Sequence, residues 1–308
     1  MATTWIKIGT RGSPLALAQA HETRRRLSQA HGIGEDAIEI VIIKTTGDMI
    51  QDRALSEAGG KGLFTKELDA AQIRGDIDIA VHSGKDLPTY LPQELEVAGF
   101  LPREDVRDVW ISLKYPTPAD LPPGAIVGTA SLRRGAMVKR LRPDVAVQLL
   151  RGNVGTRLAK VRAGDFDATL LAYAGLRRLG LTQHATQILD TGDFLPAVAQ
   201  GAIGITARIG DTATRDKLKP ILDRDTTIAV SAERAFLRVL DGSCRTPIGG
   251  YATVSGATLS FRGVVLKPDG SQAFECDAGG PVEQAEAIGE AAGHDLLQRM
   301  PADLFTTV

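Results

Sequence analysis

Arginine or lysine follows five of the strands that the sequence predicts, usually beside small residues that open a helix. The carboxyl ends of parallel strands meet at one edge of a sheet, and ligands bind at that edge in open α/β sheets. Guanidinium groups and helix N-termini both favour carboxylates. The pattern therefore predicts a site for a small ligand with several negative groups. The residues at these strand ends are Arg11, Ser13, Ser83, Lys85, Asp86, Thr129, Ser131, Arg133, Arg134, Arg151, Arg157, Arg177 and Arg178.

A solvated helix face is the alternative for any single pair of these arginines, because long basic side chains commonly cover such faces. The repetition at five strand ends favours a binding site over that alternative. Asp86 is the one carboxylate of the set, directly after Lys85. It is a candidate for stabilising a positive charge that forms during a reaction. A surface ion pair is the other interpretation, and the residues alone leave both open.

Cys244 is one of two cysteines and stands in the turn-like stretch "LDGSCRTPIGG" at 240–250. The neighbouring Arg245 favours a thiolate, whereas a buried, inert thiol is the usual state of a lone cysteine. No histidine is close in sequence to form a Cys–His pair, and His82, at the end of a predicted strand, is interpreted as structural. Cys244 and Cys276 match neither a disulfide framework nor a zinc spacing, so no metal site is predicted.

The segment "GGKGLFTKEL" at 59–68 is rich in glycine and contains a lysine. It is not a P-loop, because that motif requires Ser or Thr after the lysine, and Gly62 follows Lys61. A flexible loop that runs into a helix is the structural interpretation of this segment. A mobile lid over a site is the functional one.

Short apolar runs alternate with helix-like stretches through the first two-thirds of the chain. Ser13 and Pro14 have the types expected of the N-cap and the first position of the helix after the first strand. The alternation predicts α/β lobes whose parallel sheets are covered on both faces. The predicted strands are 5–9, 38–44, 77–83, 125–129, 145–151 and 167–173.

The pattern changes after about residue 224. Periodicity predicts a helix over 226–240 and another over 282–299. Between them, residues 256–276 alternate in polarity around a "PDG" turn at 268–270, which is typical of a hairpin. The C-terminal part is therefore predicted to be a small α+β domain.

Composition excludes several classes of protein. The 308 residues are 43% apolar and 24% charged, which is ordinary for a globular protein of two or three domains. The net charge of −1 argues against general nucleic-acid binding. No apolar run is long enough to span a membrane, and the first residues lack a signal-peptide pattern, so we expect a cytoplasmic protein with reduced thiols.

Ten sequence blocks, in one order and covering nearly the whole chain, resemble the porphobilinogen deaminases, also called hydroxymethylbilane synthases. This ordered set is far more specific than any single motif. The blocks are "IGTRGSPLALAQA", "GGKGLFTKELD", "DIAVHSGKDLPT", "REDVRD", "GTASLRR", "LRGNVGTRL", "LAYAGLRRLG", "LPAVAQGAIGI", "ERAFL" and "DGSCRTPIGGYA".

The resemblance implies a transferase of tetrapyrrole and heme biosynthesis. Such an enzyme joins four porphobilinogen molecules head to tail, with loss of ammonia, and releases hydroxymethylbilane. The resemblance implies one dipyrromethane cofactor per chain, bound through a thioether at Cys244, so that this cysteine is an anchor. Porphobilinogen carries an acetate and a propionate, which suits the basic strand ends. The family expectation is a monomer.

The resemblance also implies roles for single residues. Asp86 matches the catalytic aspartate, and Lys61 and Phe64 fall in a mobile loop over the site. The implied cofactor-binding residues are Cys244, Lys85, Thr129, Ser131, Arg133, Arg134 and Arg151. The implied substrate-binding residues are Arg11, Ser13, Arg157, Arg178 and Gln200.

The implied fold has two lobes like those of type II periplasmic binding proteins and a small C-terminal α+β domain. The predicted domains are 1–101 with 202–221, then 102–201, then 222–308, which carries the cysteine. A two-lobed binding protein for a small polycarboxylate is the main alternative, and it gives Cys244 no role. An RNA- or polyanion-binding module is a second alternative, which the net charge and the 5% aromatic content oppose.

Overall fold

The computed structural model describes residues 4–49, 64–240, 246–301 and 304. These residues pack into two compact units. The first unit contains the described residues of 1–50 and 60–104 together with 202–227, and the second contains those of 105–201 and 228–308. Lys61 and Cys244 lie outside the described residues, so their predicted roles stay predictions.

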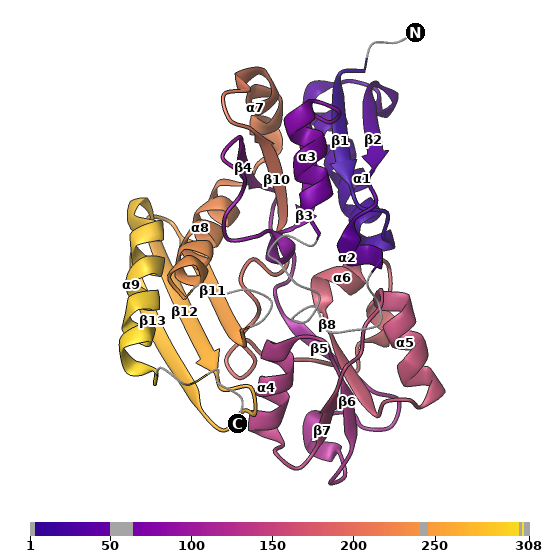
Figure 1. The fold of residues 1–308 in the computed structure, drawn as a ribbon, viewed down its shortest axis with the longest axis vertical. Coiled ribbons are helices and arrows are strands. Elements are labelled where there is room, and N and C mark those ends of the chain that lie inside the picture. The colour runs from indigo at the N-terminus through magenta and orange to yellow at the C-terminus, as the bar shows by residue number, and fades with distance from the viewer. Residues whose placement is uncertain (1–3, 50–63, 241–245, 302–303, 305–308) are drawn as a thin grey trace. The chain divides into compact units, whose positions relative to one another are not determined.

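A five-stranded sheet in the order β2-β1-β3-β10-β4 forms the centre of the first unit (Figure 1). Helix α1 packs on one face of this sheet, where Val81 joins the apolar core, and α3 packs on the other face around Ala80. Successive side chains of a strand point to opposite faces, which places the two helices on either side of β3. The strands are β1 Ile6–Thr10, β2 Ile38–Ile42, β3 Ile79–Ser83, β4 Leu95–Phe100 and β10 Ile203–Arg208.

The second unit contains a matching five-stranded sheet in the order β7-β6-β8-β5-β9. Its core gathers around the fully buried Trp110 on β5. The strands are β5 Asp108–Ile111, β6 Ile126–Gly128, β7 Ala146–Gln148, β8 Ala168–Ala172 and β9 Gln187–Ile188. The helices of the described chain are α1 Pro14–His31, α2 Thr46–Met49, α3 Lys66–Arg74, α4 Leu132–Leu141, α5 Val154–Ala163, α6 Tyr173–Arg178, α7 Thr212–Leu218, α8 Arg224–Val239 and α9 Ala285–Arg299.

In each five-stranded sheet, four strands run in the same direction and one, β10 or β5, runs antiparallel to both of its neighbours. The six strands that the sequence predicts are the ones that pair in parallel, so the prediction of parallel pairing is confirmed for them, whereas β5 and β10 were not predicted as strands. Both are almost completely buried. Burial on both faces produces a continuous apolar run whatever the strand direction, so the sequence pattern did not distinguish the two cases. The antiparallel strand of each sheet is the first one after the chain crosses from the other sheet. The chain passes from β4 of the first sheet to β5 of the second, and later from β9 of the second sheet to β10 of the first.

A three-stranded antiparallel sheet, β11-β12-β13, follows in the second unit. The predicted hairpin is confirmed, since Lys267 and Gln272 close the turn between β12 and β13 through a 2.9 Å backbone hydrogen bond. Strand β11 was not predicted. Helix α9 packs on this sheet (Figure 1), and Val264 and Leu266 join the core of the lobe around Trp110. The bounds are β11 Ile248–Ser255, β12 Thr258–Leu266 and β13 Ala273–Pro281.

The predicted fold class, two α/β lobes with a small C-terminal α+β domain, is confirmed by these three sheets. The exact domain boundaries at 101, 201 and 221 stay a prediction. Within the part of the chain that the structure describes, no helix has the length and apolar content needed to cross a membrane.

Candidate functional site

The turn between β1 and α1 forms as the sequence predicts. The Ser13 hydroxyl accepts a hydrogen bond from the backbone N–H of Ala16 at 3.3 Å, and Pro14 is the first helical residue. This cap satisfies one of the free N–H groups at the start of the helix. Arg11 and Ser13 are therefore held by a turn of defined conformation at the carboxyl end of β1.

Asp86 ends a single helical turn, Gly84–Asp86, that directly follows β3. Its Oδ2 lies 3.7 Å from Nη1 of Arg11, and the two side chains are 31% and 18% exposed. The Arg11 guanidinium also lies over the Phe64 ring, 4.1 Å from its centroid, which is a cation–π contact. We call Arg11 and Asp86 the Asp86 pair. Because this ion pair is long and partly exposed, it contributes little to stability.

A pocket of about 50 Å³ adjoins the Asp86 pair in the first unit. Most of its lining residues are polar. The apolar ones are Leu15, Ala16, Phe64 and Val81. Such a volume holds one or two water molecules, or a chemical group of that size. Its polar lining residues are Arg11, Ser13, Gln19, His82, Ser83 and Asp86.

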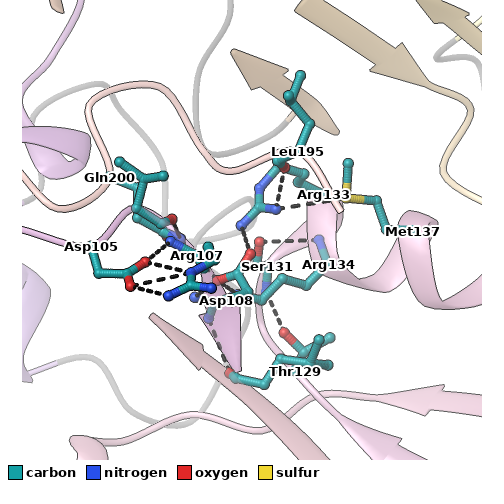
Figure 2. Close-up of polar contacts among 12 residues, drawn as sticks. Asp105, Arg107, Asp108, Thr129, Ser131, Arg133, Arg134, Met137, Leu195 and Gln200 are labelled. Carbon is teal, nitrogen blue, oxygen red and sulfur yellow. Dashed lines mark hydrogen bonds and ion pairs between the residues drawn. The ribbon is translucent and has the colours of Figure 1, made fainter. Parts of the chain in front are cut away.

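A second group of charges lies in the second unit around Asp108, the first residue of β5 (Figure 2). Its Oδ2 accepts a hydrogen bond from Nη2 of Arg133 at 2.7 Å, and its Oδ1 accepts one from Nη2 of Arg134 at 2.7 Å. The Gln200 amide also donates to Oδ1, at 3.0 Å. We call Asp108, Arg133, Arg134 and Gln200 the Asp108 cluster. Asp108 is 0% exposed and the two arginines are 4% and 5% exposed, so the cluster is buried.

Helix α4 presents the two arginines from its first turn. Ser131 is the N-cap, its hydroxyl accepts from the backbone N–H of Arg134, and its own N–H donates to Thr129 Oγ1 at 3.1 Å. Consecutive residues on a helix point about 100° apart, so neighbouring arginines normally diverge. Asp108 overcomes this divergence by binding both guanidinium groups at once.

The Asp108 cluster carries a net charge of +1, because one carboxylate faces two guanidinium groups. Burial alone would raise the pKa of Asp108, but the charges of Arg133 and Arg134 more than offset it and hold that pKa well below its usual range. Burial lowers the pKa of Arg133, and the charge of Arg134 adds to this effect, while Asp108 opposes it. Nε of Arg133 is buried and has no hydrogen-bond partner. One further carboxylate would balance the charge and could satisfy this N–H.

The other predicted arginines lie in the second unit as well. Arg157 donates from Nε to the carbonyl of Gly152 at 2.9 Å, and Arg178 donates from Nη2 to the carbonyl of Gly201 at 2.9 Å. Arg151 is half-buried at the end of the β7 segment.

The predicted site residues therefore fall into two sets. The first unit holds Arg11, Ser13, Phe64, Lys85 and Asp86, and the second holds Thr129, Ser131, Arg133, Arg134, Arg151, Arg157, Arg178 and Gln200. Asp108 was missed, although it stands in the block "REDVRD" that carried the family resemblance. A usable signal was present, because an aspartate at the start of the buried run "DVWI" requires a cationic partner.

The fold and the two charged groups define a two-lobed α/β protein suited to ligands with several carboxylates. The family model described as porphobilinogen deaminase, dipyrromethane cofactor binding domain, matches residues 6–216, and the model of the porphobilinogen deaminase C-terminal domain matches residues 227–298. Porphobilinogen deaminases of Nitrobacter winogradskyi and Nitrobacter hamburgensis are each 56% identical over 299 residues, which is 97% of this chain and 95% of theirs. The chain belongs to the porphobilinogen deaminase family.

Among solved structures, a periplasmic substrate-binding protein of an ABC transporter from Coxiella burnetii is 11% identical over 74% of this chain and 96% of its own, with a TM-score of 0.44. A putative methionine-binding lipoprotein from Bacillus subtilis is 13% identical over 71% of this chain and 90% of its own, with a TM-score of 0.43. Similarities of this size carry no argument about the site.

The predicted function follows from the family. The chain is a transferase that polymerises porphobilinogen into hydroxymethylbilane in tetrapyrrole biosynthesis, and dipyrromethane is its cofactor. The binding-protein and RNA-binding alternatives are thereby set aside.

Proposed function

We propose that the two charged groups divide the work of this reaction. Arg133 and Arg134 of the Asp108 cluster hold a carboxylate of the cofactor, and the Asp86 pair serves the reacting porphobilinogen. The observation that carries the proposal is the difference in their burial. A cluster at 0–5% exposure suits a permanent ligand, and a pair at 18–31% exposure suits one that enters and leaves.

The chemistry of the Asp108 cluster supports its assignment to the cofactor. One carboxylate would balance the cluster's net charge of +1 and could accept a hydrogen bond from the unpaired Nε of Arg133. Dipyrromethane carries such carboxylates on its rings. When bound, dipyrromethane supplies the pyrrole carbon to which the first substrate unit is joined. Asp108 orients both arginines, because its two carboxylate oxygens each bind one guanidinium group.

The Asp86 carboxylate serves as the catalytic group in this proposal. Loss of ammonia from porphobilinogen leaves positive charge on the pyrrole, and a carboxylate fixed beside it stabilises that charge. Arg11 binds a substrate carboxylate in this proposal, because its planar guanidinium matches such a group and lies within 3.7 Å of Asp86.

The remaining assignments follow the family pattern residue by residue. Arginines on separate strand ends can each bind one carboxylate of a growing chain, since each addition brings an acetate and a propionate. The further proposed cofactor-binding residues are Cys244, Lys85, Thr129, Ser131 and Arg151, the further proposed substrate-binding residues are Ser13, Arg157, Arg178 and Gln200, and the proposed loop residues are Lys61 and Phe64.

Intact-mass measurement tests the proposed anchor. The mass of the purified protein is measured before and after incubation with porphobilinogen. We expect it to exceed the mass of the unmodified chain by two porphobilinogens less two ammonias, and we expect Cys244→Ser to lack this increment. Cys276→Ser is the matched control. Burial raises the pKa of the Cys276 thiol to about 11, so this cysteine stays protonated and unreactive near neutral pH. An increment that persists in Cys244→Ser would refute the anchor.

The monomeric state, which rests on the family resemblance, and the cytoplasmic location, which is the expectation of the sequence analysis, are also proposals. Light scattering of the purified protein tests the first, and cell fractionation tests the second.

A further inference from the structure

His82 has a defined proton arrangement in the first unit, which a buried hydrogen-bond chain imposes. The chain begins at Gln72 on α3, whose Nε2 donates to the carbonyls of Thr206 at 2.8 Å and Asp78 at 3.1 Å. Both acceptors are carbonyl oxygens, so the amide nitrogen of Gln72 must face them. The amide oxygen of Gln72 must then face the other way, toward Oγ1 of Thr206 at 2.9 Å.

Thr206 transmits this orientation to His82. Its hydroxyl has a single proton, and that proton is donated to the Gln72 oxygen, which can only accept. The distance from Thr206 Oγ1 to Nε2 of His82 is 3.4 Å, and in this contact the hydroxyl oxygen can only accept. Nε2 of His82 therefore carries a proton. Gln72 and Thr206 are each 0% exposed, so no solvent competes for these positions.

The imidazole of His82 is also uncharged. Burial lowers the pKa of His82 to about 3, and the nearby charge of Arg11 adds to this effect. A neutral imidazole with a proton on Nε2 has a lone pair on Nδ1. Nδ1 has no hydrogen-bond partner among the described residues. It is also not one of the polar side-chain atoms that are both fully buried and without a hydrogen bond. His82 lines the 50 Å³ pocket beside Asp86, so this nitrogen is available to a group in that pocket.

The size and charge of the pocket indicate which group it takes. The volume of about 50 Å³ fits a group the size of one or two waters, such as an aminomethyl arm. Arg11 and Asp86 balance each other, so a neutral His82 keeps the pocket without net charge. A protonated His82 would make it positive and would repel an ammonium group.

We propose that His82 contacts the substrate directly, and that its Nδ1 accepts a hydrogen bond from the ammonium group of porphobilinogen before that group leaves. As the C–N bond breaks, its electron pair goes with the nitrogen, which departs as ammonia, and the positive charge passes to the pyrrole, where Asp86 opposes it. His82 orients the leaving group and takes no proton. This inference rests on the proposed role of Asp86.

Three variants and a spectrum test the proposal. His82→Phe removes both ring nitrogens, and His82→Asn keeps an acceptor as many bonds from Cα as Nδ1. Thr206→Val removes the acceptor that holds the proton on Nε2. His21→Asn, at an exposed position on α1, is the matched control. The rate of ammonia release is measured against porphobilinogen concentration, to separate kcat from KM.

We expect His82→Phe to lower kcat about 10- to 100-fold, the usual worth of a hydrogen bond to a charged group, with little change in KM because the arginines remain. His82→Asn is expected to recover most of this loss, and His21→Asn to match the wild type. ¹⁵N NMR of histidine-labelled protein is expected to show His82 protonated at Nε2 alone, and Thr206→Val is expected to show a mixture of tautomers with a lowered kcat.

An unchanged kcat in His82→Phe, or a proton on Nδ1 in the spectrum, would overturn the proposal. If His82→Phe does not fold, Thr206→Val and the spectrum decide the question. A wild-type protein that releases no ammonia would instead refute the proposed function, and the spectrum would still decide the tautomer of His82. The two failures are therefore distinguishable.

Discussion

The Asp86 pair and the Asp108 cluster combine the same residue types at the ends of strands, yet their packing is opposite. Asp86 lies 3.7 Å from one arginine and is 31% exposed, whereas Asp108 lies 2.7 Å from each of two arginines and is fully buried. An exposed pair can exchange its partner for a ligand at small cost. A buried group cannot lose a partner without leaving a charge uncompensated. Burial, and not residue type, is thus what distinguishes the two groups, and the proposed division of their roles rests on it.

The largest effect is expected at Asp108. Asp108→Asn leaves two buried guanidinium groups without a counter-charge, and we expect the free energy of unfolding to fall by about 3–5 kcal/mol. Urea unfolding followed by circular dichroism measures this loss.

A triple variant, Asp108→Leu with Arg133→Met and Arg134→Met, is the control for this experiment. Replacing all the buried charges by apolar side chains should restore much of the stability, because no charge is left unpaired. The variant should still lack the cofactor mass increment. A loss below about 1 kcal/mol in Asp108→Asn would show that Asp108 does not hold the arginines in solution.

The next effect is expected at Asp86, in activity and not in stability. Asp86→Asn should lower the rate of ammonia release by about 10²–10³-fold, because the fixed charge beside the pyrrole is lost. Its free energy of unfolding should change by no more than about 0.5 kcal/mol, as for a partly exposed pair. Steady-state kinetics and urea unfolding of one preparation give both values. Near-normal turnover in this variant would contradict the assignment of the catalytic group.

Gln200 provides a smaller test of the Asp108 cluster. Its amide donates to the carbonyl of Val106 at 2.8 Å and to Asp108 Oδ1 at 3.0 Å. Gln200→Leu leaves both acceptors without this donor, and we expect a loss of about 1–3 kcal/mol in the free energy of unfolding. Gln200→Glu should cost more, since it places a second carboxylate against Asp108. Equal stability of the two variants would show that the group at position 200 does not interact with the charge of Asp108.

The smallest effect, taken per pH unit, is expected in the pH dependence of stability. Burial, with the charge of Arg11, lowers the pKa of His82 to about 3, so between pH 3 and about 6.5 the unfolded chain binds a proton that the folded protein does not. The free energy of unfolding therefore falls as the pH falls through this range, by at most about 1.4 kcal/mol per pH unit.

Asp69 acts in the opposite direction over part of the same range. Burial raises its pKa to about 6, so between about pH 4 and 6 the folded protein holds a proton that the unfolded chain has lost, and stability falls as the pH rises. Asp69→Asn should therefore steepen the loss of stability in acid, and His82→Asn should reduce it. Thermal melting between pH 4 and 7 measures both slopes. Parallel slopes in the two variants would contradict these pKa shifts.

Much of the fold could be predicted from local patterns. The strand at 38–44 and the N-cap at Ser13 are close to what the structure contains, because apolar periodicity and capping chemistry act over a few residues. The strands β5 and β10 were not predicted, and local patterns do not give their direction, because an antiparallel strand buried on both faces carries the same apolar run as a parallel one.

The candidate site was predicted in composition but not in its pairing. Arg133 and Arg134 were identified from their place after a strand, and their partner Asp108 lies 25 residues earlier in the chain. His82 was interpreted as structural, because nothing near it in sequence reveals that Gln72 and Thr206 fix its proton. Such contacts join residues far apart in the chain, so no local pattern records them.

The sequence by itself determined the class of this protein, its family and the set of residues that could bind carboxylates, because these depend on residue type and order. Only the tertiary structure decided which charges are buried and which are exposed. Burial sets the cost of an unpaired charge, and it arises when distant segments such as β5 and α4 close around the same group. Two carboxylates of equal chemistry thereby differ in setting, because Asp108 is buried between two arginines and Asp86 is partly exposed beside one.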